Sequence, residues 1–184
     1  DAAGNNNTAA TQFNWTYDVT GPTYSYSDST TTSGLFGIDA VINVQLIFTE
    51  TLVVTGTPQL TLETDQTTPS TTVVDYVGLS TSSGGSNDDT LNFTYTVAVG
   101  DNTGTTTHNT LDYNWSSSSG YTPLTLNGGT IKDIAGNDAT LTLPEPIGSG
   151  GNSLVNGSAL VIDGIRPTMT ITAAEVNDGD TSND

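Results

Sequence analysis

The stretch Leu91-Asn92-Phe93-Thr94-Tyr95-Thr96-Val97 alternates apolar and polar side chains without a break. Because successive side chains of a strand point to opposite faces, this pattern predicts a half-buried β-strand. Residues 42–48 repeat the alternation, and residues 12–17 repeat it with an aromatic inner face. Weaker strand candidates, bounded by turn-forming residues, are residues 59–63, 72–77, 140–143, 159–163 and 168–172. The sequence therefore predicts an all-β chain, an Ig-like antiparallel β-sandwich of about seven strands.

The charge of the chain is strongly one-sided. Lys132 and Arg166 are the only strong bases against 20 acids, which gives a formal net charge of −18. Nucleic acids and anionic membrane surfaces attract Lys and Arg, so we expect neither as a partner. The chain lacks Cys, and no apolar run approaches the roughly 18 residues of a membrane helix, so we expect no direct membrane insertion in this segment. Such excess negative charge favours bound divalent cations or an elongated body.

Two short signatures occur twice in the same order, which indicates an internal repeat. The pattern D-x-A-G-N occupies residues 1–5 and 133–137, and the pattern D-x-x-x-P-T occupies residues 18–23 and 163–168. The proline in the second pattern lacks an amide donor and stiffens a junction. We expect three parts: the C-terminal strand of a preceding repeat (1–20), a complete sandwich (21–165) and the start of the following repeat (166–184).

The aromatic strand near the N-terminus has no sandwich of its own under this division. Phe13, Trp15 and Tyr17 share one face, and an exposed aromatic strand invites pairing with another chain. Two explanations stay open. Either the chain belongs to a longer polypeptide of tandem repeats, or this strand completes a sandwich in another copy, as in filaments assembled by donor-strand exchange.

Several motifs resemble those of one family. Residues 53–62 read V-V-T-G-T-P-Q-L-T-L, residues 124–137 read L-T-L-N-G-G-T-I-K-D-I-A-G-N, and residues 141–144 and 161–168 follow as L-T-L-P and V-I-D-G-I-R-P-T. This order resembles the bacterial-type Ig-like, cadherin-like tandem repeats of very large extracellular adhesins. The resemblance implies a β-sandwich in a tandem array, a role as an extending or adhesive shaft that is often stiffened by Ca²⁺, and no catalytic residues.

The acidic C-terminal end offers one candidate metal site. Asp178, Asp180, Ser182 and Asp184 place an oxygen-bearing side chain at every second position. Ca²⁺ takes six to eight oxygen ligands, and short acidic side chains in a turn can converge on one ion. The alternative interpretation is a solvated acidic turn.

The junction acids offer a second candidate. Asp18 and Asp163 hold equivalent places before their prolines, where a cation would bridge two repeats. Asp133, Asn137 and Asp138 are expected to contribute from a neighbouring loop. The alternative is turn chemistry, because Asp and Asn side chains bond their own backbone in turns.

The remaining candidate residues concern sugars and catalysis. His108 is the only histidine and no nucleophile motif accompanies it, so we expect no enzyme. Trp115 and Tyr113 are the candidates for stacking on a glycan in an alternative function, a carbohydrate-binding module that recognises cell-surface glycans. Five N-x-S/T sequons, which begin at Asn6, Asn14, Asn92, Asn114 and Asn156, are candidate glycosylation sites if the source is eukaryotic. The alternative is chance, because a sequence rich in Thr and Asn produces such sequons freely.

Together these patterns predict an extracellular structural or adhesive repeat that forms an elongated stalk or filament at the cell surface. Its expected partners are neighbouring repeats or identical subunits, and its expected cofactor is Ca²⁺ at the repeat junctions. The alternatives are the carbohydrate-binding module and the donor-strand filament subunit.

Overall fold

The computed structural model describes residues 3–4, 16–65, 70–83, 88–105, 109–115, 122–146 and 152–170. These residues contain eleven strands, one short 3-10 helix and one α-helix. The elements are β1 (Tyr24–Asp28), β2 (Gly34–Phe36), β3 (Val41–Phe48), β4 (Val53–Thr55), β5 (Gln59–Asp65), β6 (Ser70–Ser80), β7 (Thr90–Thr96), η1 (Thr103–Thr105), β8 (Asp112–Tyr113), β9 (Leu124–Thr125), β10 (Thr130–Lys132), α1 (Leu154–Gly157) and β11 (Leu160–Ile162).

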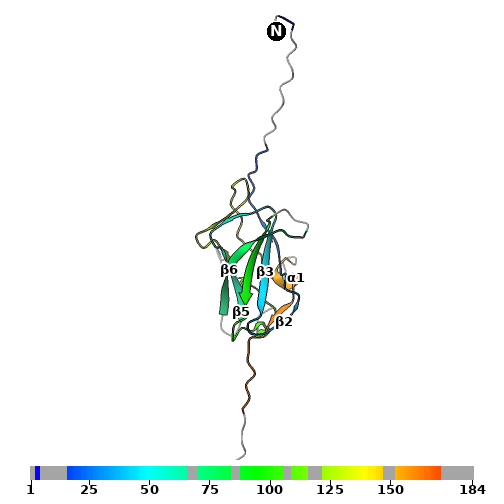
Figure 1. Cartoon of the computed structure of the whole chain (residues 1–184), viewed down its shortest axis with the longest axis vertical. Helices are drawn as coiled ribbons and strands as arrows, with labels where there is room; N and C mark the ends of the chain where they lie inside the picture. The colour runs from blue at the N-terminus through cyan, green and yellow to red at the C-terminus, as the bar shows by residue number, and fades with distance from the viewer. Residues whose placement is uncertain are drawn as a thin grey trace, which may run out of the picture.

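The largest sheet runs in the order β1-β3-β7-β6-β5-β8, with β9 paired to β5, and all its pairs are antiparallel. It curls into a half-barrel, so the predicted all-β sandwich class is confirmed (Figure 1). The alternation sets the register of its centre: Ile42 lies opposite Tyr95, and Leu46 lies opposite Leu91. All four side chains are buried on one face, as a period of two requires.

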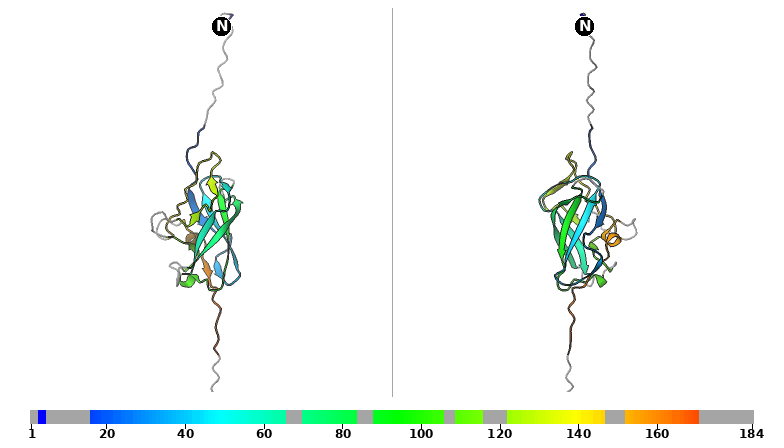
Figure 2. Two further views of the ribbon diagram at one scale, coloured as in Figure 1. Left: turned by 90° about the vertical axis from the view of Figure 1, so that its left-hand side faces the viewer. Right: turned by 45° about the vertical axis from the view of Figure 1, so that its right-hand side comes forward.

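Two smaller strand pairs and the helix complete the core. β2 pairs in parallel with β11, and β4 pairs antiparallel with β10. Ile131 of β10, Leu154 of α1 and both Leu160 and Ile162 of β11 belong to the same buried cluster as the large sheet. Figure 2 shows α1 beside the sheet, where its Asn152–Gly157 neighbourhood covers the free edge of β1. Covering an edge strand in this way protects it from pairing with other chains.

Two predicted strands are corrected by the structure. Residues 140–143 form no strand, although Leu143 is buried. Pro144 and Pro146 follow directly, and a residue without an amide hydrogen cannot continue a ladder. Residues 168–170 are extended but unpaired, with Met169 83 % exposed, because no neighbouring strand reaches them. Residues 171–172 lie outside the described part of the chain.

The chain joins and leaves the folded body at opposite ends (Figures 1 and 2). We call the end next to residues 16–22 the leading pole, and the end from which residues 163–170 depart the trailing pole. At the trailing pole the amide of Gly100 donates to the carbonyl of Gly164 at 3.1 Å, which fixes the point of departure. Across the described ranges, no helix has the length and apolar character needed to span a membrane.

Candidate metal centre

Three carboxylates meet at the leading pole. Asp18 comes from the segment that leads into the body, Glu50 from the turn between β3 and β4, and Asp133 from the loop after β10. One carboxylate oxygen of each lies within 4.8 Å of the others. Asp18 is exposed, Glu50 is half-buried and Asp133 is buried. The cluster lines a small pocket of ≈ 210 Å³ to which Ile134 also contributes.

The loop at residues 133–137, here called the tip loop, holds Asp133 and the leading segment together. The backbone amide of Asn137 donates to Asp133 Oδ1 and its side-chain amide donates to Asp133 Oδ2, both at 2.7 Å. The same Asn137 Nδ2 lies 3.1 Å from the carbonyl oxygen of Thr20 and 3.3 Å from that of Asp18. One signature of the repeat, D-x-A-G-N, therefore binds the other, D-x-x-x-P-T.

The turn that carries Glu50 is tied to the β6–β7 loop by its backbone. Phe48 donates its amide to Asp89 and Leu52 donates its amide to Asp88, each at 2.9 Å from the carbonyl oxygen. Asp89 is itself held, because its carboxylate accepts hydrogen bonds from the amide and hydroxyl of Ser82 at 2.7 and 2.6 Å. These contacts place the Glu50 backbone at the leading pole.

Burial, neighbouring charges and hydrogen bonds shift the pKa values of two of the three carboxylates. Partial burial raises the pKa of Glu50 above its ordinary value, and the charges of Asp18 and Asp133 raise it further. Burial also acts to raise the pKa of Asp133, but the hydrogen bonds from the tip loop outweigh it and hold that pKa low. In the described part of the chain, the single ion pair is that of Lys132 with Asp138, at 2.5 Å. Among the described residues, therefore, no base pairs with the three carboxylates.

The donor set suits a hard divalent cation. The three carboxylates carry six oxygens, of which both Asp133 oxygens and Asp18 Oδ1 already accept hydrogen bonds from Asn137 and Thr20. Thr49 and Thr51 line the same pocket. Ca²⁺ accepts six to eight oxygens in flexible geometry, whereas a soft metal would need thiolate or imidazole ligands. Because like charges at this separation repel one another, a bound cation would also relieve their repulsion. The residues present therefore fit Ca²⁺ in charge and ligand type.

The predicted metal ligands are distributed unequally over the structure. Asp18, Asp133 and Asn137 come together, although Asn137 acts through its amide hydrogens on the other two. Asp138 pairs with Lys132, whereas Asp163 bridges to Asn102 at the start of the segment that leaves the trailing pole. The predicted site at Asp178, Asp180, Ser182 and Asp184 lies outside the described residues. Glu50 was not among the predicted ligands. The available signal was an acid two residues after the strong strand pattern of residues 42–48.

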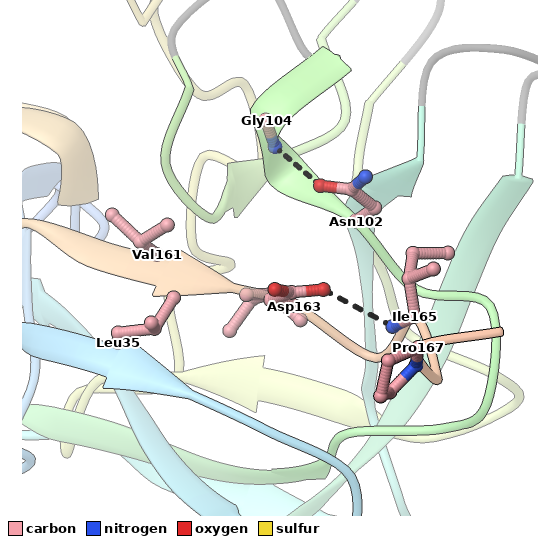
Figure 3. Close-up of a pocket in the computed structure, with 8 residues that line it drawn as sticks. Leu35, Asn102, Gly104, Val161, Asp163, Ile165 and Pro167 are labelled. Carbon is pink, nitrogen blue, oxygen red and sulfur yellow. Dashed lines mark hydrogen bonds between the residues drawn. The ribbon is translucent and has the colours of Figure 1, made fainter. Parts of the chain in front are cut away.

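Asp163 lines a separate, largely apolar pocket of ≈ 660 Å³ at the trailing pole (Figure 3). Its carboxylate accepts a hydrogen bond from the amide of Ile165 at 3.1 Å, and Asn102 Oδ1 accepts one from the amide of Gly104 at 2.8 Å. Both polar side chains are thus engaged by local turns.

Of the two residues predicted to stack on a glycan, Tyr113 is contradicted by its burial. Tyr113 is 1 % exposed, and its hydroxyl donates to the carbonyl of Pro144 at 2.8 Å, so its ring cannot meet a sugar. Burial raises the pKa of this phenol above its ordinary value. Trp115 is half-buried and packs against the core. Its strand neighbour Asp112 is buried as well, so no local alternation marks Tyr113 as a core residue.

The predicted sequons differ in their surroundings. Asn92 lies on the outer face of β7 as expected, but its Nδ2 donates to Gly78 and Ser80, both at 3.0 Å. Asn156 is exposed on α1, and Asn114 is half-buried after β8. Asn6, Asn14 and His108, together with the aromatic residues Phe13 and Trp15, lie outside the described residues. Glycosylation stays a prediction.

No protein family, curated protein sequence or solved structure was found to match this chain. The resemblance to adhesin repeats therefore stays an expectation drawn from the sequence motifs. The function is therefore inferred from the geometry of the leading pole and from the repeated signatures.

Proposed function

We propose that this chain is a segment of an extracellular tandem-repeat protein, which works as a structural or adhesive thread and is stiffened by Ca²⁺ between repeats. The observation that carries the proposal is the meeting of Asp18 with Glu50 and Asp133. The first acid lies in the segment that carries the D-x-x-x-P-T signature, and the other two belong to the body.

The repeated signature explains why such a cluster would join two repeats. Asp163 follows β11 of the body directly, and Asp18 occupies the same place in the earlier copy of the signature. By this equivalence Asp18 closes the preceding repeat, so a cation held by the cluster would bridge two bodies. Tyr17 then corresponds to Ile162, which is fully buried, whereas Tyr17 is 87 % exposed here. That contrast supports a missing sandwich around Tyr17.

The positions of the two poles give the array its direction. Because the chain joins at one end of the body and leaves at the other, successive copies extend along one line (Figure 1). Only residues 19–21 separate the acid of one repeat from the buried Pro22 of the next, so the junction is short. A short junction with a bridging cation resists bending and spreads the charge of −18 along a thread.

The same site is the reason for proposing an extracellular location. A partly exposed cluster of three carboxylates resembles the weak extracellular Ca²⁺ modules, which bind at roughly 10⁻⁴ to 10⁻³ M. Such affinity is useful only where free Ca²⁺ is abundant. We propose no catalytic role for any residue of the chain.

The test uses two copies joined as residues 1–165 followed directly by residues 21–184. This join keeps Gly164, where a Cβ would collide with the Ala98 carbonyl, and Gly21, where a Cβ would collide with the Asp138 carbonyl. Small-angle scattering then compares Ca²⁺ with a chelator. A long, stiff particle that becomes flexible on chelation supports the proposal, and a particle that is flexible in both contradicts it.

Glu50→Gln supplies a matched pair of variants. In the second copy it removes a ligand from the new junction, so stiffness in Ca²⁺ should fall. In the first copy it leaves that junction intact and should leave stiffness unchanged. Concentration-dependent polymers of the single chain, independent of Ca²⁺, would instead favour assembly by donor-strand exchange.

A further inference from the structure

The trailing pole carries an apolar hollow with no occupant from the described residues. Leu35 of β2, Val161 of β11, Ile165 and Pro167 line it. Leu35 is 70 % exposed and Ile165 is 53 % exposed. Figure 3 shows Leu35 and Val161 on one side of Asp163, at the end of β11, and Ile165 and Pro167 on the other. Apolar side chains gathered at one exposed spot favour a contact that removes them from water.

The repeated signature indicates which direction this hollow faces. Asp163, Ile165 and Pro167 all line it, as every second residue of an extended segment does. The equivalent residues of the leading segment are Asp18, Thr20 and Pro22. There the Asp18 carboxylate meets Asp133 of the tip loop, and Pro22 is buried in the body. The same face of the linker thus lines the trailing hollow of one repeat and meets the tip loop of the next.

The tip loop presents an apolar side chain at the corresponding place. Ile134 follows Asp133 directly, lines the leading-pole pocket with Asp18, and is 78 % exposed. Its neighbours in the tip loop are the small residue Ala135 and Gly136. An aliphatic side chain so exposed beside an acidic cluster contributes nothing to the fold of its own body.

We infer that Ile134 of each repeat inserts into the trailing hollow of the repeat before it, against Leu35, Val161 and Ile165. This inference rests on the proposed tandem function. The cation bridge alone fixes one point of the junction and leaves rotation about the linker free. An apolar contact beside it adds a second point, so the two together set the twist between successive repeats.

The experiment uses the same two-copy chain with Val77→Cys in each copy. Val77 is 61 % exposed in β6, and the chain has no other Cys, so each copy takes one spin label. Pulsed electron paramagnetic resonance then gives the distribution of distances between the labels in Ca²⁺. Ile134→Asp in the second copy should turn a single narrow distance peak into a broad one. Ile134→Asp in the first copy, which faces no preceding body, should leave the peak narrow.

Two further outcomes separate this contact from the tandem function. If the two-copy chain without the Ile134 substitution gives a broad distribution in Ca²⁺, the proposed stiff junction is itself wrong. If its peak is narrow and Ile134→Asp in the second copy leaves it so, only the insertion of Ile134 is wrong. Ile134→Val should preserve the narrow peak. In the single chain, where Ile134 is exposed, Ile134→Asp should unfold at the parent temperature, which confirms an intact body.

Discussion

Gly21→Ala tests whether the leading segment packs on the tip loop. Gly21 lies so close to the loop that an added Cβ would stand 2.9 Å from the carbonyl carbon of Asp138 and closer still to its oxygen. Real Cβ atoms do not approach backbone this closely, and neither backbone can yield by a rotamer change. The segment must therefore move away from the tip loop.

The hydrogen bonds at stake set the size of the effect. Asn137 Nδ2 would lose its hydrogen bonds to the carbonyl oxygens of Asp18 and Thr20. The amide of Thr140 would lose its 2.9 Å hydrogen bond to the carbonyl oxygen of Pro22. Each bond contributes about 0.5–1.5 kcal/mol, with exposed ones at the lower end, so we expect a loss of about 2 kcal/mol. For a domain of this size that loss lowers Tm by roughly 4–8 °C. Ca²⁺ stabilisation should fall as well, because Asp18 leaves the cluster.

Thermal unfolding followed by circular dichroism, in Ca²⁺ and in chelator, measures both effects. Gly37→Ala is the matched control, since its Cβ would meet only the Asp163 carbonyl oxygen at an ordinary 3.8 Å. The control should unfold at the parent temperature or slightly above it. If Gly21→Ala matches the parent in Tm and in its response to Ca²⁺, the docking of the segment on the tip loop is refuted.

Three other changes test the site and the fold. A concentration of free Ca²⁺ a hundredfold above its Kd should stabilise the parent by about 2.7 kcal/mol, measured by calorimetry. Glu50→Gln should lose most of this stabilisation. Glu145→Gln, at an exposed acid outside the cluster, should keep it. Hydrogen bonds hold the pKa of Asp89 below its ordinary value against the effect of burial, so its contribution to stability is present above about pH 4 and lost as pH falls through the lowered pKa. Asp89→Asn should therefore cost more stability in urea at pH 7 than at pH 3, and an equal cost at both would contradict this. Burial raises the pKa of Tyr24 to about 12, so its contribution is complete below pH 10 and is lost as pH rises toward 12; Tyr24→Phe should flatten the alkaline fall in the urea midpoint, and an unchanged slope would count against it.

The long strands could be predicted because each has one buried face. β3, β5 and β7 alternate in sequence as they alternate in burial. The short strands β4, β8, β9 and β10 span two or three residues, too few to show a period. β1 alternates Tyr and Ser, yet Tyr26 is exposed and Ser27 is buried, because a bulge shifts its register against β3. That inversion depends on a neighbouring strand and leaves no mark in the sequence.

The candidate site was predictable only in part. The repeated signatures drew attention to Asp18 and Asp133, but local patterns gave no reason for them to meet. Their contact depends on Asn137, whose amide reaches across more than a hundred residues of chain to the leading segment. Glu50 joins them only because the turn after β3 is bonded to the loop before β7. A short sequence motif cannot predict contacts between segments that lie so far apart in the chain.

If the matching signatures mark successive copies of one sandwich joined end to end, the two-copy chain has a defined shape that cryo-electron microscopy in Ca²⁺ can determine. We expect two bodies on one axis, with Asp163 of the first copy beside Glu50 and Asp133 of the second. Bodies lying side by side, or an Asp163 remote from both acids, would contradict it.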